Sequence, residues 1–397
     1  MNRLLRLLLA PPDPLRPLRR GVVAADHANG QRRWAEAEAA YAQALAVDPL
    51  RADLWVQYGH TLKEQGRRTE AETAYRSAVA ADPASADARL CLAALNGHPV
   101  EDVASPSRLL DVDDLPARDA IRVPRPAPAP SQGARHWPSR LAQAPRRSPV
   151  VFFHLHKTGG LTLDDVLAAH FAPGRICPVK DDHLHVYTPD QLGAFDLFSG
   201  HFDVGALRLL RQSPQTLSIL REPRSRLISF YRFHAGHDLG GRHGVNEFAQ
   251  LANALTAEAF FEHPKVRRAP EVFNHYLSVF SLTYAQVRAA PDVTIDVIDP
   301  ATVDKAVARV RGLTAVGVVE RFDDAVALAC GTLGLAPPRA IRSRNQTDQL
   351  ARKMKGRAPP PVARTERLEA AMADLIRFDQ PIYAAAKAEF EKRWSAR

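Results

Sequence analysis

Cysteine is scarce in this chain of 397 residues, which has three: Cys91, Cys177 and Cys330. The three are widely separated and odd in number, and no Cys-x-x-Cys pair occurs. A disulfide framework is therefore excluded as an organising feature. This usage favours a reducing compartment, with three isolated thiols that serve only packing.

Long apolar runs are also missing. The apolar stretch at the N-terminus is interrupted by Arg6 and stops at Pro11, so it is too short to span a bilayer, and no small-residue cleavage site follows it. No other stretch reaches the roughly 18 apolar residues of a membrane-spanning helix. We therefore expect a soluble, cytoplasmic protein without a transmembrane segment, although the basic start leaves a weak membrane-surface role open.

Acidic residues are the minority charge. The chain has 44 Asp and Glu against 53 Lys and Arg, a formal net charge of +9. This excess suits an anionic ligand or partner but does not choose among a nucleotide, a nucleic acid, an acidic glycan and a membrane surface. The length predicts two or three domains.

An internal repeat occupies residues 20–96. Ala37, Tyr41 and Ala44 recur 34 residues later as Ala71, Tyr75 and Ala78. Thirty-four residues is the period of a tetratricopeptide helix pair, in which small residues let two helices approach and aromatic residues fill the gaps. A truncated helix at 86–95 would cap the stack, because terminal repeats differ from inner ones. The segment is therefore predicted to be an all-α tetratricopeptide module, a scaffold that binds protein partners.

Residues 97–148 have a different composition. Prolines alternate at positions 124, 126, 128 and 130, and residues 122–147 contain six arginines and no acidic residue. Such a segment is typical of a stiff, basic linker.

From residue 149 onward, short apolar runs alternate with helical patterns. Runs of strand length occur at 150–155, 195–199, 216–220 and 314–319, and helical spacing occurs at 162–170, from 225, at 303–310 and at 323–333. This alternation predicts an α/β domain over residues 149–397 with a parallel sheet. Ligands of such sheets bind at the carboxyl ends of the strands.

The first predicted strand leads into a candidate anion-binding loop at residues 156–162. Gly159 and Gly160 allow a tight bend and bare N–H groups, and the following helix adds its positive dipole end. Lys157 supplies a charge, and Thr158 and Thr162 supply hydroxyl donors. A phosphate-like group is the natural ligand. The alternative is a tight strand–helix turn with an incidental lysine.

The loop is not a nucleoside-triphosphate loop of the GxxxxGK[ST] type. In that motif the lysine follows the last glycine and stands next to a metal-binding hydroxyl. Here Lys157 precedes both glycines, and the six residues before it contain no glycine. The order of residues disfavours a kinase or an ATPase.

Two longer blocks resemble a known family. Residues 152–160 (FFHLHKTGG) resemble the 5′-phosphosulfate loop of the carbohydrate sulfotransferases related to heparan sulfate 2-O- and 6-O-sulfotransferases, and residues 220–231 (LREPRSRLISFY) resemble the 3′-phosphate motif of that family. Shorter matches follow in the family's order at 199–202, 316–322 and 344–345, and then at Asp379, Tyr383 and Phe390. The resemblance covers roughly residues 150–394.

The resemblance implies a P-loop-like parallel sheet sandwiched by helices, the sulfotransferase fold, and 3′-phosphoadenosine 5′-phosphosulfate (PAPS) as the sulfuryl donor. It assigns donor binding to Lys157, Thr158, Gly159, Gly160, Thr162, Arg221, Ser229, Arg344 and Asn345. Two positions depart from the family. His156 stands where Pro or Gln is common, and Leu161 stands where a hydroxyl residue is common.

Catalysis is assigned to Lys157 and His201. Lys157 can neutralise charge on the bridging and leaving oxygens. His201 follows a predicted strand, matches the family's catalytic histidine block, and has an imidazole suited to accept the proton of an acceptor hydroxyl. Glu222 and Asp203 are the alternative bases.

No metal site is expected. His-x-His spacing occurs at 154–156 and 183–185, and His234, His237 and His243 form a further loose group, but no nearby acid or cysteine completes a zinc set.

We therefore predict a sulfotransferase that acts on a carbohydrate hydroxyl, with a possible protein partner on the repeat module and no nucleic acid. The competing interpretation is a binding protein, in which the repeats recruit a partner and the C-terminal domain binds a nucleotide without catalysis.

Overall fold

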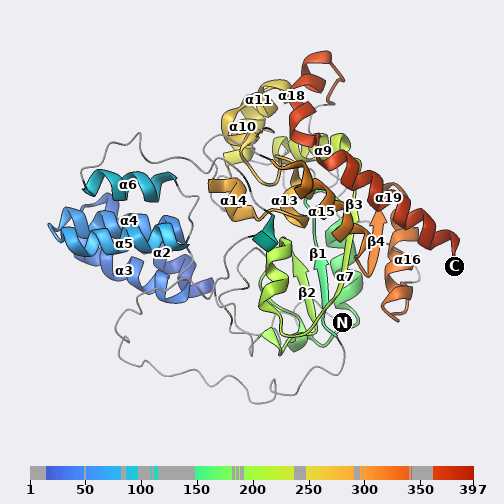
Figure 1. The fold of residues 1–397 in the computed structure, drawn as a ribbon, viewed down its shortest axis with the longest axis horizontal. Helices are drawn as coiled ribbons and strands as arrows, with labels where there is room; N and C mark the ends of the chain where they lie inside the picture. Colours follow the sequence, from blue (N-terminus) through green and yellow to red (C-terminus); the bar gives the residue numbers. More distant parts are fainter. Residues whose placement is uncertain are drawn as a thin grey trace.

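The computed structural model describes residues 15–48, 51–81, 86–96, 109, 111–114, 148–180, 184, 187, 192–236, 247–289, 296, 298–338, 341 and 361–397. These residues build two hydrophobic cores that share no member. One core lies within the N-terminal helices, and the other surrounds a parallel β-sheet (Figure 1).

The N-terminal core is formed by antiparallel helix pairs. Helix α2 packs on α3, α4 packs on α5, and α6 closes the stack. Their bounds are α2 Leu15–Gly30, α3 Trp34–Val47, α4 Ala52–Glu64, α5 Arg68–Ala81 and α6 Ala86–Asn96. The helical repeat and its terminal helix at 86–95 are confirmed at this level.

Residues that recur at the 34-residue period occupy equivalent buried positions in the helices. Tyr41 of α3 and Tyr75 of α5 are at most 1% exposed. A Cβ atom on Gly59 of α4 would lie 2.5 Å from the Tyr75 ring, so only glycine lets these two helices approach. Glycine at position 59 therefore allows the Tyr75 ring to pack against α4.

The C-terminal core is built on four parallel strands in the order β2-β1-β3-β4. They are β1 Val150–Phe153, β2 Leu197–Gly200, β3 Gln215–Leu220 and β4 Ala315–Val318. In register, Phe153 of β1 pairs with Gly200 of β2 and Ser218 of β3. The predicted α/β architecture with a parallel sheet is confirmed, and each predicted strand coincides with an observed one.

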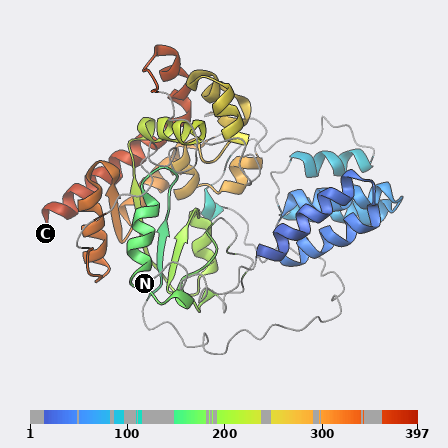
Figure 2. The same cartoon turned by 180° about the vertical axis from the view of Figure 1, so that it is seen from behind.

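Helices cover both faces of the sheet. Helices α13 and α15 lie in front of it in Figure 1, and α7 lies in front of it in the reverse view of Figure 2. The helices are α7 Gly160–Ala168, α9 Pro223–Ala235, α10 Glu247–Ala254, α11 Ala257–Glu262, α12 Pro264–Arg267, α13 His275–Phe280, α14 Tyr284–Ala289, α15 Pro300–Arg311, α16 Phe322–Thr332, α18 Glu366–Ile376 and α19 Asp379–Ser395. Short 3-10 helices are η2 Val112–Asp114, η5 Pro173–Arg175, η7 Val204–Leu209 and η9 Val319–Arg321.

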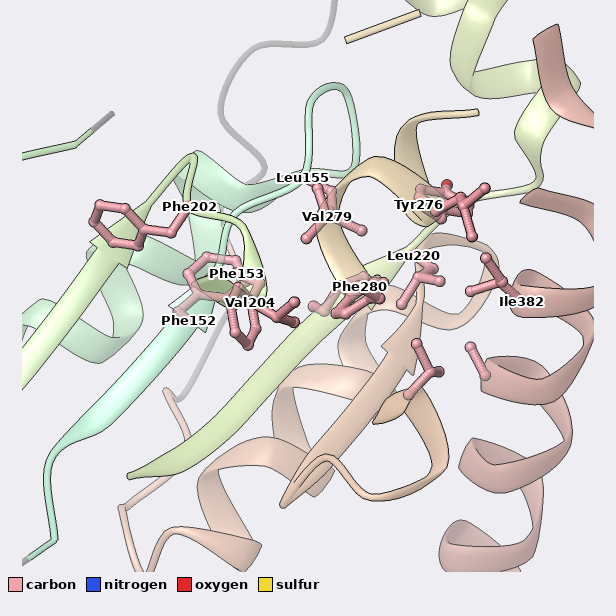
Figure 3. Close-up of a cluster of buried hydrophobic side chains, with 14 of the residues drawn as sticks. Phe152, Phe153, Leu155, Phe202, Val204, Leu220, Tyr276, Val279, Phe280 and Ile382 are labelled. Atoms are coloured by element: carbon pink, nitrogen blue, oxygen red, sulfur yellow. The ribbon is translucent and has the colours of Figure 1, made fainter. Parts of the chain in front are cut away.

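Large apolar side chains fill the space beneath the carboxyl ends of the strands. Figure 3 draws Leu155, Val279, Tyr276 and Leu220 among the buried side chains of this cluster. The rings of Phe153 and Phe280 meet edge to face with centroids 5.7 Å apart, which ties β1 to α13. This packing gives the residues above it a rigid floor.

Part of the segment expected to be a linker belongs to the C-terminal core. Leu109 is buried and forms a parallel bridge with Ile298, and Val112 is buried in the same cluster. The Asp111 carboxylate is 2% exposed and receives both terminal nitrogens of Arg309 of α15, at 2.7 and 2.8 Å. This contact could not be predicted from the composition of residues 97–148, because the apolar anchor consists only of Leu109 and Val112 within a Pro- and Arg-rich stretch.

Within the described ranges, no helix combines the length and the apolar character needed to cross a membrane. The cytoplasmic location stays a prediction.

Candidate functional site

The carboxyl ends of the four strands bring the distant sequence blocks to one edge of the sheet. His201 follows β2, the loop with Lys157 follows β1, Arg221 follows β3, and Glu320 follows β4. Because β1 lies between β2 and β3, its loop is flanked by the His201 and Arg221 segments. Open parallel sheets bind ligands at this edge, so these residues form the candidate site.

Both glycines of the loop are required by close contacts. Gly159 has φ +76°, and a Cβ atom there would lie 2.8 Å from Cε2 of Phe322. A Cβ atom on Gly160 would lie 1.8 Å from Cδ2 of His154. The backbone is therefore left bare where the loop enters α7.

The first turn of α7 presents backbone donors. The helix begins at Gly160, two residues before the predicted start, so Gly160 and Thr162 lie in its first turn and not in the loop. No side chain caps this end, and within the described part of the chain the N–H groups of Gly159, Gly160 and Leu161 donate no hydrogen bond. Such an end is suited to an anion.

The two threonines of the predicted site differ in their surroundings. The hydroxyl of Thr158 is buried and donates to the carbonyl oxygen of Leu155 at 2.9 Å, so it braces the loop. Thr162 is 5% exposed, and its backbone N–H donates to the carbonyl oxygen of Gly159 at 3.0 Å.

Lys157 is a half-buried cation. Its φ of +67° is unusual for a residue with a side chain, and its Nζ lies 3.8 Å from the centroid of the Phe233 ring of α9. Burial, and then the neighbouring Arg221 guanidinium, lowers the pKa of Lys157 to about 8. Among the described residues, no carboxylate lies within ion-pair distance of this ammonium. The group is therefore desolvated without a counter-ion.

Arg221 is held beside the same loop. The Tyr276 hydroxyl accepts the Arg221 N–H at 2.9 Å and donates to the Arg221 carbonyl oxygen at 2.5 Å. The guanidinium donates to the Lys157 carbonyl oxygen at 3.5 Å. Burial lowers the pKa of Arg221, despite the opposing fields of Glu320 and Glu222. Two desolvated cations thus share one small region, an arrangement that an anion would stabilise.

Carboxylates next to these cations have structural partners. Glu222 caps α9 by accepting the N–H groups of Arg224 and Ser225 at 3.0 and 2.7 Å. Glu320 accepts the Glu222 N–H at 2.9 Å and the Tyr383 hydroxyl at 3.0 Å. Glu222, an alternative base on sequence grounds, is occupied as a helix cap.

The other alternative base, Asp203, is also engaged. It is 1% exposed and accepts the N–H groups of Gly205 at 2.8 Å and Tyr284 at 3.0 Å. Burial and these bonds suit a structural role between η7 and α14.

His201 has a defined orientation. Its backbone N–H donates to the Lys180 carbonyl oxygen at 2.6 Å, and its Nδ1 lies 2.5 Å from the His154 carbonyl oxygen. A carbonyl oxygen only accepts, so Nδ1 carries the proton and Nε2 of the neutral ring carries the lone pair. A side chain in this tautomer has the nitrogen that a general base needs.

Three further histidines surround His201. The His156 ring stacks on it with centroids 3.8 Å apart, and the His154 ring is tilted toward it at 4.6 Å. Nε2 of His275 accepts the backbone N–H of His156 at 3.2 Å. Burial lowers the pKa of His154, His156 and His275 well below the usual range of histidine, and nearby positive groups add to this effect. These three rings are neutral at pH 7.

A comparison with protein families identifies part of the helical region that precedes this domain. The tetratricopeptide repeat family model matches residues 52–95. This range contains α4, α5 and nearly all of α6, so the predicted repeat is confirmed there. The match does not extend to the sheet, and the chain has no match among curated proteins.

Other predicted site residues fall into two groups. Ser229 lies partly exposed on α9, and no described contact joins its hydroxyl to Arg221. Arg344 and Asn345 lie outside the described residues, as do His183, His185, His237 and His243. In the part of the chain that is described, no group of three or more His, Cys, Asp or Glu is arranged to hold a metal ion.

Sequence reasoning missed three residues of the site: Phe233, His275 and Tyr276. Phe233 lies two residues after the second block, and an apolar side chain at such a helical position is typical of ordinary core. His275 and Tyr276 begin α13, far from any recognisable motif, and are fully buried. No pattern in the sequence marks them, because only the tertiary fold brings α13 against the loop.

Proposed function

We propose that the C-terminal domain is a sulfotransferase that takes a sulfuryl group from PAPS and transfers it to an acceptor hydroxyl on a carbohydrate. The observation that carries this proposal is the pair of desolvated cations, Lys157 and Arg221, beside unused N–H groups at the strand edge. The resemblance of residues 152–160 and 220–231 to the sulfotransferase motifs then selects a 3′-phosphorylated nucleotide among the possible anions.

The proposal gives each residue of the predicted site a role in binding the donor. The N–H groups of Gly159, Gly160 and Leu161, with Thr162, would hold the 5′-phosphosulfate end. Arg221, with Ser229, would hold the 3′-phosphate, because a guanidinium can grip a phosphate with two hydrogen bonds. Arg344 and Asn345 complete the donor site on the resemblance alone. Leu161 takes part through its backbone, so its missing hydroxyl removes a side-chain donor only.

His201 and Lys157 would act on the reacting atoms. In the reaction the bond from the acceptor oxygen to sulfur forms as the bond from sulfur to the phosphate oxygen breaks, which leaves adenosine 3′,5′-bisphosphate. Nε2 of His201 accepts the hydroxyl proton, and the Lys157 ammonium stabilises charge on the leaving oxygen. No step requires a metal.

The tetratricopeptide module suits a separate role. Repeats of this kind commonly form scaffolds for protein partners. We place a protein partner there, so that the module directs the enzyme to its acceptor.

The direct test is transfer of labelled sulfate from PAPS to a panel of glycans. We expect transfer by the wild-type chain and a loss of about 100-fold or more in both His201→Ala and Lys157→Ala, as is typical for a lost acid–base or electrostatic group. Transfer that is unaffected in both His201→Ala and Lys157→Ala would contradict the site assignment. Donor binding without transfer to any acceptor would favour the nucleotide-binding alternative.

A further inference from the structure

The ring of His201 contacts two other imidazoles. His156 stacks on it almost in parallel, with an interplanar angle of 13° and centroids 3.8 Å apart. His154 approaches at 4.6 Å with an angle of 34°. His154 itself is fixed, because its ring stacks on Phe152 and its edge lies against Gly160.

The backbone of His156 is held by a chain of two hydrogen bonds. Nδ1 of His275 lies 3.0 Å from the Pro270 carbonyl oxygen, so it donates, and Nε2 of His275 is left to accept the His156 N–H at 3.2 Å. His275 is fully buried. The backbone that carries the His156 ring is therefore tied to the start of α13.

A base contributes to catalysis only when its lone pair points at the proton to be removed. The bond from Nδ1 of His201 to the His154 carbonyl sets the tautomer only while the ring faces that carbonyl, and an imidazole with the freedom to turn away from it can exchange its two neutral forms. A flat ring stacked on one face removes that freedom. His156 occupies that face.

We propose that His156 is a positioning residue for the base His201, and that its stacked ring holds the Nε2 lone pair toward the acceptor hydroxyl. This inference rests on the proposed function, in which His201 removes the hydroxyl proton. It gives a role to a residue that departs from the family, where Pro or Gln is common and provides no aromatic ring.

The neutral state of His156 suits this role. Burial, and then the nearby His201 ring, lowers the pKa of His156 well below its usual range. A neutral ring adds contact area without placing a second positive charge beside His201 as it gains a proton. Among the described residues, the buried Nδ1 atom of His156 has no hydrogen-bond partner, and the ring contacts His201 face to face and His275 edge to face.

The test compares His156→Gln, which removes the ring, with His156→Phe, which keeps a flat ring of similar width. His170→Gln serves as the control, because that histidine is exposed on the chain that follows α7. Three quantities are measured: kcat, KM for PAPS, and the ¹⁵N chemical shifts of His201 in histidine-labelled protein without any substrate. The shifts report which ring nitrogen carries the proton.

We expect His156→Gln to lower kcat by about tenfold or more, a fraction of what a general base contributes, with KM for PAPS little changed. His156→Phe should regain most of this loss. In the ¹⁵N spectrum, His201 should show the Nδ1–H form in the wild type and in His156→Phe, and a mixture of forms in His156→Gln.

The inference is overturned if His156→Gln leaves both kcat and the His201 shifts as in the wild type. It is also overturned if His156→Phe loses as much kcat as His156→Gln, because the stack would then have no role. A wild-type chain that transfers no sulfate defeats the proposed function instead, and the ¹⁵N comparison still tests the positioning of His201.

Discussion

At the scale of single residues, the site is defined by charges and rings that the fold desolvates. The Lys157 ammonium lies over the Phe233 ring, and no carboxylate in the described chain is within ion-pair distance of it. The backbone N–H of the neighbouring Arg221 donates to the Tyr276 hydroxyl. A cation that is withdrawn from water without a counter-ion is costly unless a ligand compensates it. In the proposed function, the anionic donor would provide this compensation.

The lowered pKa of Lys157 predicts how binding depends on pH. Its folded pKa of about 8 lies below the ordinary value of 10.5, so the ammonium loses its proton as pH rises through 8. The phosphates of adenosine 3′,5′-bisphosphate are already ionised there, since their second pKa is near 6. We expect affinity for this nucleotide to be highest near pH 7 and to fall as pH rises through 8, by up to about tenfold per pH unit.

Calorimetric titration between pH 7 and 10 checks this prediction. Lys157→Arg is the matched control, because a guanidinium stays charged over the whole range and its variant should show no such fall. An affinity that stays constant in the wild type would show that the charge of Lys157 does not contribute to binding.

The sequence predicted some of these residues and not others for a physical reason. Lys157, Arg221 and His201 follow strands directly, so parallel pairing alone places them at one edge. The helices α9 and α13 carry Phe233, His275 and Tyr276, and no local sequence pattern specifies how these helices pack on the sheet. Likewise, the stacking of His156 on His201 joins residues on two different strand ends.

At the scale of elements, apolar runs were sufficient to find the strands, because each is short and buried on both faces. Helices α10 to α14 were not predicted, since they are short and several contain aromatic residues without a clear period. Tertiary contacts stabilise them. One such contact is made by Asp379 of α19, whose Oδ1 accepts the N–H groups of Tyr276 and Leu277 at the start of α13.

The anchor between η2 and α15 gives a prediction at this scale. Asp111 is buried and accepts hydrogen bonds from Arg309, from the Ser281 hydroxyl and from the Asp113 N–H. We expect Asp111→Ala to lower the free energy of unfolding of the C-terminal domain by about 3 kcal/mol, as is typical when one partner of a buried ion pair is removed. Asp113→Ala is the control, because its carboxylate is 67% exposed and also contacts Arg309.

Urea unfolding followed at several pH values measures the difference. Burial alone would raise the pKa of Asp111, but the bonds from Arg309 and Ser281 outweigh it and hold this pKa well below its usual value. Asp111 therefore stabilises the fold above pH 4, and this contribution declines as the solution becomes more acidic. Equal destabilisation by Asp111→Ala and Asp113→Ala would show that burial of Asp111 has no special role.

At the scale of the whole molecule, a tetratricopeptide module and an α/β domain occur in one chain, and each has its own core. Composition and the 34-residue period were enough to separate them. The apolar anchor at residues 109–114 was not predicted, because Leu109 and Val112 gain meaning only from the surface that receives them.

The central claim is that the strand edge binds a 3′,5′-bisphosphorylated nucleotide, and calorimetry on the full chain tests it most directly. We predict that adenosine 3′,5′-bisphosphate binds the wild type, that 5′-AMP binds at least about tenfold more weakly because it lacks the phosphate for Arg221, and that Arg221→Met removes this difference. Absence of binding, or equal binding of both nucleotides to the wild type, would contradict the account.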